Sequence, residues 1–552
     1  MFRCFLLLAL TACAQPVKES GTVPLRILSF NDFHGQIQSE NPSPGKLPVM
    51  NGGVEEMVDA GGAAYLAGLI ARERAEHPNH ILVSGGDLTG ASPLTSALLQ
   101  DEPTIRVMNR IGLDLNVVGN HEFDYGRAEL LRKAEGGCLE PDDCRQGPFQ
   151  GAAFDYLAAN VVDEVTGAPF FSPYAIREFD GIPVGFIGVV TDETPFIVSA
   201  AGIKGLKFLD AAETLNLYAA ELRSRGVGAI VAVMHEGASV PADIATDGSP
   251  CIGMVGALTD MVEKTDDDVD LFITGHTHQS YACRLDGRLV IQTASYGRML
   301  SVTDLMLDRA SGDVVSAAVK NLPVTRDIDP DAEIVAEVAG AEAATAPIRA
   351  QPVAEFSGQV LRLPDANGES ALGDVIADAQ LASAKLLGAE IAFMNPGGIR
   401  QDLPSDPAAG PAVTLGDLFA VQPFGNNLVA MDLTGAEIKL LLEQQWIDQP
   451  EDRRPRMLQI SDGFSYCFDD RRADGDKILA STMKLGGSMI DPAKTYRIVV
   501  NSFLADGGDR FTVLKNGGNR SQGEGDLDAL RAHLTSGGDV PLKPQSRICR
   551  AS

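Results

Sequence analysis

Five short segments of the sequence place aspartate, asparagine and histidine at spacings suited to metal chemistry. They are residues 32–34 (Asp-Phe-His), 85–87 (Gly-Gly-Asp), 119–122 (Gly-Asn-His-Glu), 234–236 (Met-His-Glu) and 275–278 (Gly-His-Thr-His), and together they hold five of the eight histidines. Oxygen and nitrogen donors of this kind suit borderline or hard divalent cations, and one aspartate between two clusters could bridge two ions. The segments therefore predict a two-metal hydrolase site.

Each segment closely follows an apolar or β-branched run, which indicates a buried strand. The runs are 25–30, 81–84, 115–118, 229–233 and 269–274. Side chains at the carboxyl ends of such strands converge at one edge of a sheet, where open α/β folds build their sites. Asp32 and His34 can both turn toward one ion if the chain bends there, whereas His276 and His278 could each serve a different ion.

Each segment taken alone would be ordinary. A histidine after a strand is more often a hydrogen-bonded structural residue, and an aspartate there is usually a turn former or a helix cap. The Gly-Asn pair at 119–120 could also be only a turn, because both residues tolerate positive φ. Five such segments in one part of the chain favour a joint metal site instead.

The length and patterning predict two α/β domains. At 552 residues the chain is too long for one ordinary domain. Strand-like and helix-like stretches alternate to about residue 323, and the composition shifts to Asp, Ala, Glu and Val between 327 and 346. We therefore expect a first domain over 25–326, a linker or hinge helix over 327–350 and a second domain over 351–552.

The N-terminus fits a secretory signal, because one arginine precedes an apolar run too short to span a bilayer. Residues 10–13 (Leu-Thr-Ala-Cys) resemble a bacterial lipobox, which implies removal of 1–12, acylation of Cys13 and a polar tether over 13–24. An ordinary signal peptide cut nearby is the alternative. No later run reaches about eighteen uninterrupted apolar residues, so we expect a lipid-anchored protein whose catalytic part lies in water.

The charge balance restricts the partners. With 45 basic and 75 acidic side chains the net charge is −30, which disfavours nucleic-acid polymers at long range. A small phosphate could still bind, since metal ions and nearby arginines set the local sign. The oligomeric state is left open.

Six cysteines remain beyond Cys4 and Cys13, and an even number in an exported chain suggests three disulfides. Six cysteines allow fifteen pairings. Proximity and domain membership favour Cys138–Cys144, Cys251–Cys283 and Cys467–Cys549. The alternative is that some of these cysteines are buried free thiols.

In order and spacing, the five segments resemble the calcineurin-like metallophosphatase superfamily, and 119–126 (Gly-Asn-His-Glu-Phe-Asp-Tyr-Gly) resembles its 5′-nucleotidase branch. Segments 395–400 (Asn-Pro-Gly-Gly-Ile-Arg), 422–425 (Gln-Pro-Phe-Gly) and 502–509 (Ser-Phe-Leu-Ala-Asp-Gly-Gly-Asp) resemble the C-terminal nucleotide-binding domain of that family. The resemblance covers nearly the whole mature chain. It implies a four-layer α/β sandwich followed by a smaller α/β domain.

The resemblance also implies a role for each residue of the metal site, with zinc, manganese or a similar ion at both positions. It gives one ion to Asp32, His34 and His278, the other to Asn120, His235 and His276, and the bridge to Asp87. His121 and Asp124 match the catalytic pair of the family. His278 departs from the Gln or Asn that several nucleotidases have there, which should preserve ligation.

In the second domain, Phe424 and Phe503 match two aromatic residues that sandwich a nucleobase in the family; core packing is the alternative. By the same resemblance, Asn395 or Asn426 would contact the base, Asp509 the ribose hydroxyls and Arg400 an oxygen-rich part of the substrate. Arg362 lies near the place of further family arginines, but 362–368 does not align cleanly. The family is known for a domain rotation, which makes 327–346 the expected hinge.

These expectations combine into a 5′-nucleotidase lipoprotein, periplasmic or surface-exposed in a bacterial cell envelope. It would hydrolyse nucleoside 5′-monophosphates, and nucleoside diphosphates or nucleotide sugars are further candidates. Alternatives on the same scaffold are a 2′,3′-cyclic phosphodiesterase with 3′-nucleotidase activity, a nucleotide-sugar hydrolase and a thiosulfohydrolase. From another class, a non-catalytic surface-binding lipoprotein would have kept only the fold.

Overall fold

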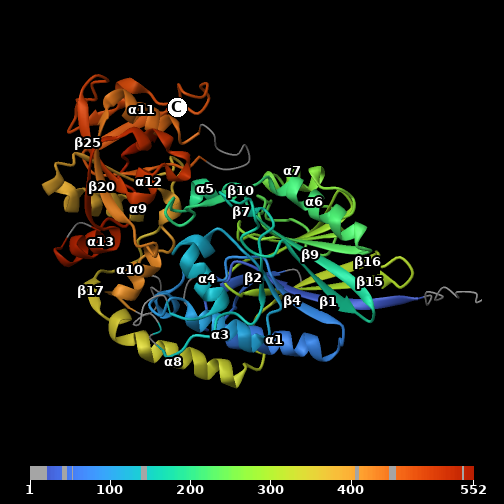
Figure 1. Ribbon diagram of the computed structural model, residues 1–552. Helices are drawn as coiled ribbons and strands as arrows, with labels where there is room; N and C mark the ends of the chain where they lie inside the picture. Colours follow the sequence, from blue (N-terminus) through green and yellow to red (C-terminus); the bar gives the residue numbers. More distant parts are fainter. Residues whose placement is uncertain are drawn as a thin grey trace, which may run out of the picture.

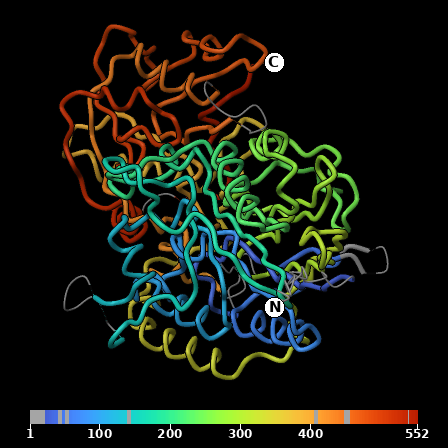
Figure 2. Tube along the Cα trace, turned by 45° about the vertical axis from the view of Figure 1, so that its right-hand side comes forward, coloured from blue at the N-terminus to red at the C-terminus, as the bar shows by residue number. Residues whose placement is uncertain are grey.

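The computed structural model describes residues 21–39, 46–51, 54–138, 144, 146–404, 410–446, 455–537 and 540–551. The predicted signal peptide and Cys13 lie outside these ranges. Within them, the chain folds into two α/β domains, with the second lying against one end of the first (Figure 1 and Figure 2). The predicted fold class is therefore confirmed.

Two six-stranded sheets form the centre of the first domain (Figure 1). The first has the order β16 (Val314–Pro323), β15 (Met299–Asp308), β1 (Thr22–Phe30), β4 (His80–Ser84), β5 (Leu115–Val117) and β6 (Asp155–Leu157). The second has the order β13 (Ser280–Leu285), β14 (Arg288–Thr293), β12 (Leu271–Ile273), β11 (Ala229–His235), β9 (Ile182–Val190) and β8 (Tyr174–Phe179). Neighbours from β1 to β6 and from β14 to β9 pair in parallel.

The sheets pack face to face through alternate apolar residues of their strands, among them Ile27, Val83, Val231 and Ile273. The intervening residues of the same strands face outward and are buried under helices. Strands covered on both faces require nearly continuous apolar runs, which explains why the sequence shows such runs. The first sheet lies under α1 (Ala63–Ala75), α3 (Glu102–Ile111) and α4 (Arg127–Glu135), and the second under α6 (Ala211–Ser224) and α7 (Ala257–Lys264).

Local signals fix where the main helices begin and end. Asp210 caps α6 by accepting a hydrogen bond from the backbone N–H of Glu213 at 2.8 Å. Pro103 lies in the first turn of α3, and Gly112 ends that helix in the left-handed region at φ 72°. The four layers are thus helix, sheet, sheet and helix.

The second domain is built on one five-stranded sheet. Its order is β21 (Gln459–Ile460), β18 (Ile391–Met394), β25 (Thr495–Asn501), β20 (Asn427–Thr434) and β26 (Gly518–Gly525). Helices α9 (Ala371–Ser383) and α13 (Asp526–Thr535) cover one face, and α11 (Gly435–Glu443) covers the other. A small sheet of β24 (Ser488–Met489), β23 (Lys484–Leu485), β22 (Phe464–Phe468) and β27 (Ile548–Arg550) completes the domain.

Shorter elements complete the two domains. The paired strands are β2 (Lys46–Asn51) with β3 (Val54–Asp59), β7 (Val161–Asp163) with β10 (Leu206–Phe208), and β17 (Pro352–Glu355) with β19 (Ala412–Thr414). The short helices are α2 (Leu94–Ala97), α5 (Thr194–Ile197), α10 (Leu415–Val421) and α12 (Ser502–Ala505), with 3₁₀ turns η1 (His121–Phe123) and η6 (Gly508–Arg510).

Helix α8 (Ala332–Arg349) lies within the range predicted as a linker. Asp331 caps it by accepting hydrogen bonds from the backbone N–H groups of Glu333 and Ile334 at 2.9 and 3.0 Å. The helix runs along the outside of the first domain (Figure 1), where it contacts α1, α2 and α3, and it also contacts α10 of the second domain. It therefore touches both bodies that a rotation would move.

Three disulfides join the cysteine pairs that proximity and domain membership favoured, so this prediction is confirmed. Their Cα–Cα distances are 5.5 Å for Cys138–Cys144, 5.0 Å for Cys251–Cys283 and 4.4 Å for Cys467–Cys549. The last one ties β27 to β22 near the C-terminus. Among the described residues, no helix is both long enough and apolar enough to cross a bilayer.

Candidate metal centre and substrate cavity

The seven predicted metal ligands meet at one edge of the two sheets of the first domain. Each follows or ends a strand: β1, β4 and β5 in the first sheet, β11 and β12 in the second. The residues are Asp32, His34, Asp87, Asn120, His235, His276 and His278. Five of them, all except the last two, are no more than 2% exposed. Two sheets are thus needed to complete one cluster.

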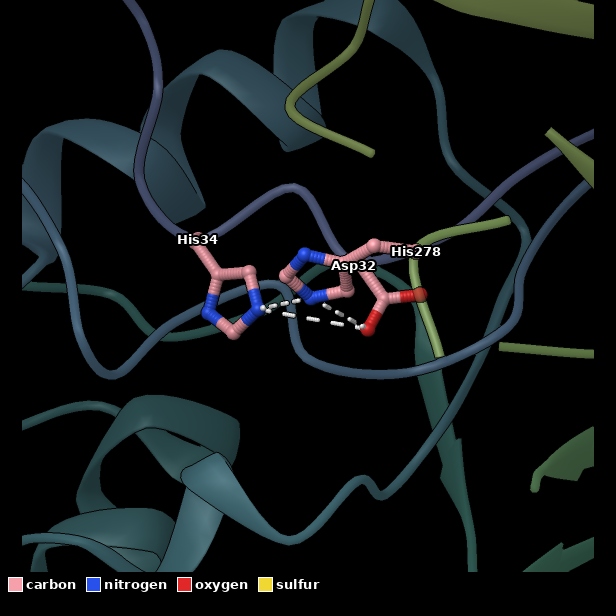
Figure 3. A group of neighbouring side chains, drawn as sticks. All are labelled: Asp32, His34 and His278. Atoms are coloured by element: carbon pink, nitrogen blue, oxygen red, sulfur yellow. Dashed lines mark hydrogen bonds and ion pairs between the residues drawn. The ribbon is translucent and has the colours of Figure 1, made fainter. Parts of the chain in front are cut away.

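Asp32, His34 and His278 form one half of the cluster (Figure 3). The Nε2 atoms of the two histidines lie 3.2 Å apart, and the Oδ1 atom of Asp32 is 3.3 Å from Nε2 of His278 and 3.9 Å from Nε2 of His34. A group of three donor atoms at this spacing fits a single divalent cation.

The other half surrounds Asn120. Its Oδ1 atom lies 3.1 Å from Nε2 of His235 and 3.0 Å from Nδ1 of His276. The Oδ2 atom of Asp87 lies 3.1 Å from Nε2 of His235 and 3.6 Å from Nε2 of His34. Asp87 thus stands between the halves, where a bridging ligand would be needed.

The backbone bends sharply at these positions. Five of the seven residues have positive φ, namely Asp32 (49°), His34 (49°), Asp87 (52°), His276 (72°) and His278 (57°). Residues other than glycine adopt this conformation at a cost, and such strain gathers at functional sites where the surrounding structure enforces it. The bends let two residues separated by one position face the same cluster.

Backbone carbonyls hold two ligand histidines in the orientation that metal binding needs. Nδ1 of His34 lies 2.9 Å from the carbonyl oxygen of Gly90, and Nδ1 of His235 lies 2.8 Å from that of Gly85. A carbonyl can only accept, so each Nδ1 carries the proton and each Nε2 presents a lone pair to the cluster.

The electrostatics of the cluster also fit cations. Burial lowers the pKa of His34 to about 3, so its imidazole is neutral, as a ligand must be. Burial also opposes the charged form of His235, yet the carboxylates of Asp87 and Asp32 raise its pKa to about 10. In the absence of a metal, a proton on Nε2 of His235 is therefore favoured at the place where an ion would lie, and a divalent cation would displace that proton when it binds.

His121 and Asp124 lie together at the rim of this cluster, at the first residue of η1 and at the residue that follows it. Nδ1 of His121 is 2.9 Å from Oδ2 of Asp124, and the side chain of His121 is 12% exposed. Burial would lower the pKa of His121, but the charges of Asp124 and Asp87 outweigh it and raise that pKa. The arrangement favours the protonated form of His121, as a role as proton donor to the cavity requires.

Glu122 is a residue that the sequence reasoning missed. Its carboxylate accepts hydrogen bonds from the backbone N–H groups of Gly119 and Leu88 at 2.7 Å and of Asp87 at 3.0 Å. It thereby ties the loop after β4 to the loop after β5 and fixes Asp87. The available signal was an acidic residue directly beside His121, in a segment already singled out.

A cavity of about 500 Å³ lies between the cluster and the second domain. From the first domain it is lined by Asn120, His121, Asp124 and His276, among others. From the second domain it is lined by all six predicted substrate residues: Asn395, Arg400, Phe424, Asn426, Phe503 and Asp509. Arg456 also lines it and was not found from the sequence, whereas Arg362 is exposed and is not part of the lining.

Phe424 stacks directly on His121, the predicted catalytic histidine. The ring centroids of Phe424 and His121 are 5.7 Å apart, with an angle of 15° between the planes. The guanidinium carbon of Arg400 lies 5.8 Å from the centroid of Phe424. Phe424 is half-buried, and this contact places it at the cavity wall. Phe503 is partly packed against the core of the second domain as well as lining the cavity.

The polar residues of the second domain are linked to one another. Nδ2 of Asn395 donates to Oδ2 of Asp509 at 2.8 Å, and Nδ2 of Asn501 donates to Oδ1 of Asn395 at 2.9 Å. Asn395 is therefore held against Asp509 and orients that carboxylate. Oδ1 of Asn426 accepts a hydrogen bond from Oγ of Ser502 at 3.1 Å.

Two family models match the chain in the order that its domains have. Residues 25–280 match the calcineurin-like phosphoesterase family, and residues 352–516 match the 5′-nucleotidase C-terminal domain. The chain belongs to the 5′-nucleotidase family. Its candidate metal residues lie in the phosphoesterase domain, and its six predicted substrate residues lie in the 5′-nucleotidase C-terminal domain.

Relatives of this 5′-nucleotidase family member are described as different kinds of protein. The chain is 34% identical to an endonuclease of Bacillus subtilis over 93% of its own length and 40% of that protein. It is 36% identical to a cell wall protein of Listeria monocytogenes over 90% of its own length and 64% of that protein. It therefore spans less than two thirds of either relative.

A crystal structure of a 5′-nucleotidase precursor from Thermus thermophilus shares the fold. It is similar to this family member with a TM-score of 0.76 and 26% identity, over 96% of this chain and all of that one. The likeness extends over both domains of the present chain.

The geometry suits hydrolysis of a phosphate ester. The predicted ligands would hold two divalent cations, which would supply polarisation of a phosphoryl group and a more acidic bound water. His121 can hold a proton at the rim, with Asp124 fixing its ring and favouring its charged form. Arg400 adds a positive charge above Phe424, on the side of the second domain.

Proposed function

We propose that this protein hydrolyses nucleoside 5′-monophosphates to nucleoside and phosphate. The observation that carries the proposal is one cavity that reaches the edge of the candidate metal centre at Asn120 and His276 and is lined on the other side by the predicted nucleotide residues. In this reaction the oxygen of water bonds to phosphorus, the bond from phosphorus to the ribose 5′ oxygen breaks, and His121 gives a proton to the departing oxygen.

The roles proposed for the residues are those that the family resemblance implies, and the positions of the residues support them. Asp32, His34 and His278 hold one ion, Asn120, His235 and His276 hold the other, and Asp87 bridges them. Phe424 and Phe503 hold the base, since stacking tolerates any base. Asp509 accepts from the ribose hydroxyls, and Arg400 binds phosphate oxygens.

The first experiment is phosphate release by the mature chain with added Mn²⁺ or Zn²⁺, comparing AMP, 3′-AMP, 2′,3′-cyclic AMP and UDP-glucose. We expect the fastest release from AMP, and loss of about 10²- to 10⁴-fold in kcat for His121→Ala, the range for a lost general acid. Activity on another substrate alone would contradict the nucleotide assignment. A metal-dependent activity is one that EDTA abolishes and added metal restores. If no phosphate release of this kind is found, a non-catalytic binder is favoured.

A second candidate is phosphodiester or nucleotide-sugar hydrolysis. A separate cavity of about 340 Å³ is lined by Gln36, Gln38 and Tyr296 of the first domain and by Arg349 and Gln401, and Arg400 lines both cavities. The Tyr296 ring lies 5.2 Å from that of His278 and 5.7 Å from that of His34. This space could hold a second group on the attacked phosphorus.

This candidate has a simple test in a volume-filling variant. Ala346→Trp on α8 puts a large ring at a position that lines the second cavity, and Ala344→Trp on the same helix is the exposed control. Selective loss of UDP-glucose hydrolysis in the first variant supports the candidate. If the wild type and both variants hydrolyse AMP at one common rate and UDP-glucose at one common rate, this cavity is ruled out as the subsite.

We also propose a cell-envelope location with Cys13 as a lipid anchor. Three disulfides support an exported protein, and one relative is described as a cell wall protein. Incorporation of labelled palmitate that Cys13→Ser abolishes would support the anchor. A protein that is exported and unlabelled would indicate an ordinary signal peptide instead.

A further inference from the structure

Glu193, a residue of the first domain, faces two arginines of the second domain. It lies immediately before α5, and its side chain is 11% exposed. Its Oε2 atom is 3.5 Å from Nη2 of Arg456, and its Oε1 atom is 3.4 Å from Nη2 of Arg510. The guanidinium of Arg510 also lies 4.7 Å from the ring centroid of Phe196 on α5. One carboxylate thus joins the catalytic domain to two cations across the domain interface.

The same contact reaches the proposed ribose site. Arg456 lines the large cavity, and its Nη1 atom lies 3.8 Å from Oδ1 of Asp509. Oδ2 of Asp509 is already held by Asn395 at 2.8 Å. Arg456 therefore stands between two carboxylates, Glu193 in one domain and Asp509 in the other, and its position depends on both.

The turn that carries Asp509 is strained. Asp509 and Arg510 are consecutive residues with φ of 53° and 64°, and Gly507 before them has φ of 83°. A left-handed conformation at two successive non-glycine residues persists only when surrounding contacts enforce it. Asn395 holds this turn from inside the second domain, and Glu193 holds it from the first domain through Arg510. Without Glu193 the turn would lose its anchor on the side facing the catalytic domain.

The two carboxylates and the two arginines of this contact are mostly shielded from water. The side chains of Glu193 and Asp509 are 11% and 12% exposed, and those of Arg456 and Arg510 are 13% and 27% exposed. Attraction between charges is stronger in such surroundings than on an open surface. Loss of the Glu193 charge would leave Arg456 with Asp509 as its nearest carboxylate partner. That guanidinium would then compete with the ribose hydroxyls for Asp509.

We infer that Glu193 is a positioning residue for nucleoside recognition, supplied by the catalytic domain. It holds Arg456 away from full pairing with Asp509 and holds Arg510 so that the strained turn keeps Asp509 in the cavity. Selectivity for a ribose diol is then a property of the docked pair of domains and not of the second domain alone. The inference rests on the proposed nucleotidase function and deepens it.

The test compares AMP with 2′,3′-dideoxy-AMP, which lacks the hydroxyls that Asp509 would bind. We expect the wild type to prefer AMP by about tenfold in kcat/KM, the effect of one hydrogen bond to a charged group. Glu193→Gln keeps the shape and removes the charge, and should reduce this preference to about twofold while changing the rate on dideoxy-AMP little. Glu178→Gln, an exposed glutamate of the same domain, is the matched control.

Several outcomes are distinguishable. If the wild type does not hydrolyse AMP, the nucleotidase proposal fails; if it does and Glu193→Gln keeps the full preference for AMP, this inference fails. Calorimetric binding of adenosine gives a readout without turnover, and we expect it to weaken in the same variant. If Glu193→Gln does not fold, Arg510→Gln tests the same link, because it leaves the pair of Glu193 and Arg456 in place. An equal loss on both substrates would indicate a merely structural role.

Discussion

The two walls of the cavity are built in different ways. The catalytic wall is backed by the predicted ligands Asp32, Asp87 and His235, which lie at strand ends, are almost wholly buried, and are held by backbone groups of their own domain. On the nucleotide wall, Phe424 and Phe503 are half-buried on loop or short-helix segments, and Asp509 lies on a strained turn.

The difference teaches which property each domain controls. A site fixed by two packed sheets can hold charges in one geometry whatever the other domain does. The nucleotide wall meets that site only across an interface whose contacts include Glu193, Arg456 and Arg510. Chemistry should therefore survive changes in the second domain, whereas selectivity should respond to changes on either side.

The sharpest test of a self-sufficient catalytic wall is Asp87→Asn. Removing the bridging charge should lower metal content and reduce phosphate release by about a thousandfold or more, for AMP and for ribose 5-phosphate alike, since both need the same charge stabilisation. Metal content by mass spectrometry and initial rates provide the measurement. Asp267→Asn, an exposed carboxylate of the same domain, should change neither. Retention of two ions with normal rates would show that Asp87 is not a ligand.

Glu122→Gln tests whether the catalytic wall depends on its supporting carboxylate. The amide would turn N–H groups toward the backbone donors of Gly119, Leu88 and Asp87, so the loops should separate slightly. We expect metal affinity to fall about 10- to 100-fold, as for other residues that orient metal ligands, with rates restored at high metal concentration. Glu135→Gln is the exposed control. A rate that stays low at saturating metal would instead point to a direct role in turnover.

Phe424→Ala separates the two walls most directly. Loss of base stacking, worth about 1–3 kcal/mol, should lower kcat/KM for AMP about 5- to 100-fold. Ribose 5-phosphate carries no base, so its rate should change little. Phe424 also stacks on His121, so its loss could lower the rate through His121 as well as through the base. An equal loss on both substrates would mean that Phe424 acts by orienting His121, and that the walls are not independent.

The residue pattern alone predicted the metal centre of the catalytic wall, whereas the nucleotide wall was predicted only through the family resemblance, for a physical reason. Asp32, Asp87 and His235 follow apolar runs, and a buried strand leaves such a run in the sequence. The roles of Glu122 and Glu193 left no comparable signal, because each arises from loops that meet only after folding. Glu193 and Arg456 are 263 positions apart and lie in different domains. Positive φ at Asp32 and His34 was likewise foreseen only as a bend.

The second domain should also respond to pH independently of the first. Burial raises the pKa of Asp374 to about 8, assisted by the nearby charge of Glu369 and opposed by that of Arg547. Its ordinary pKa is about 4, so the folded state favours the protonated form. The stabilisation is complete below about pH 4 and is lost as the pH rises through about 8.

The measurement is thermal unfolding between pH 6 and 9, followed by domain. We expect the unfolding temperature of the second domain to fall by a few degrees as the pH rises over this range. Asp374→Asn should make this fall smaller, because an amide cannot ionise. The exposed Asp474→Asn of the same domain should leave it unchanged. If the catalytic domain melts together with the second domain at every pH, the interface is strong enough to make the two walls one cooperative unit. The independence inferred from their different construction would then apply to chemistry and not to stability.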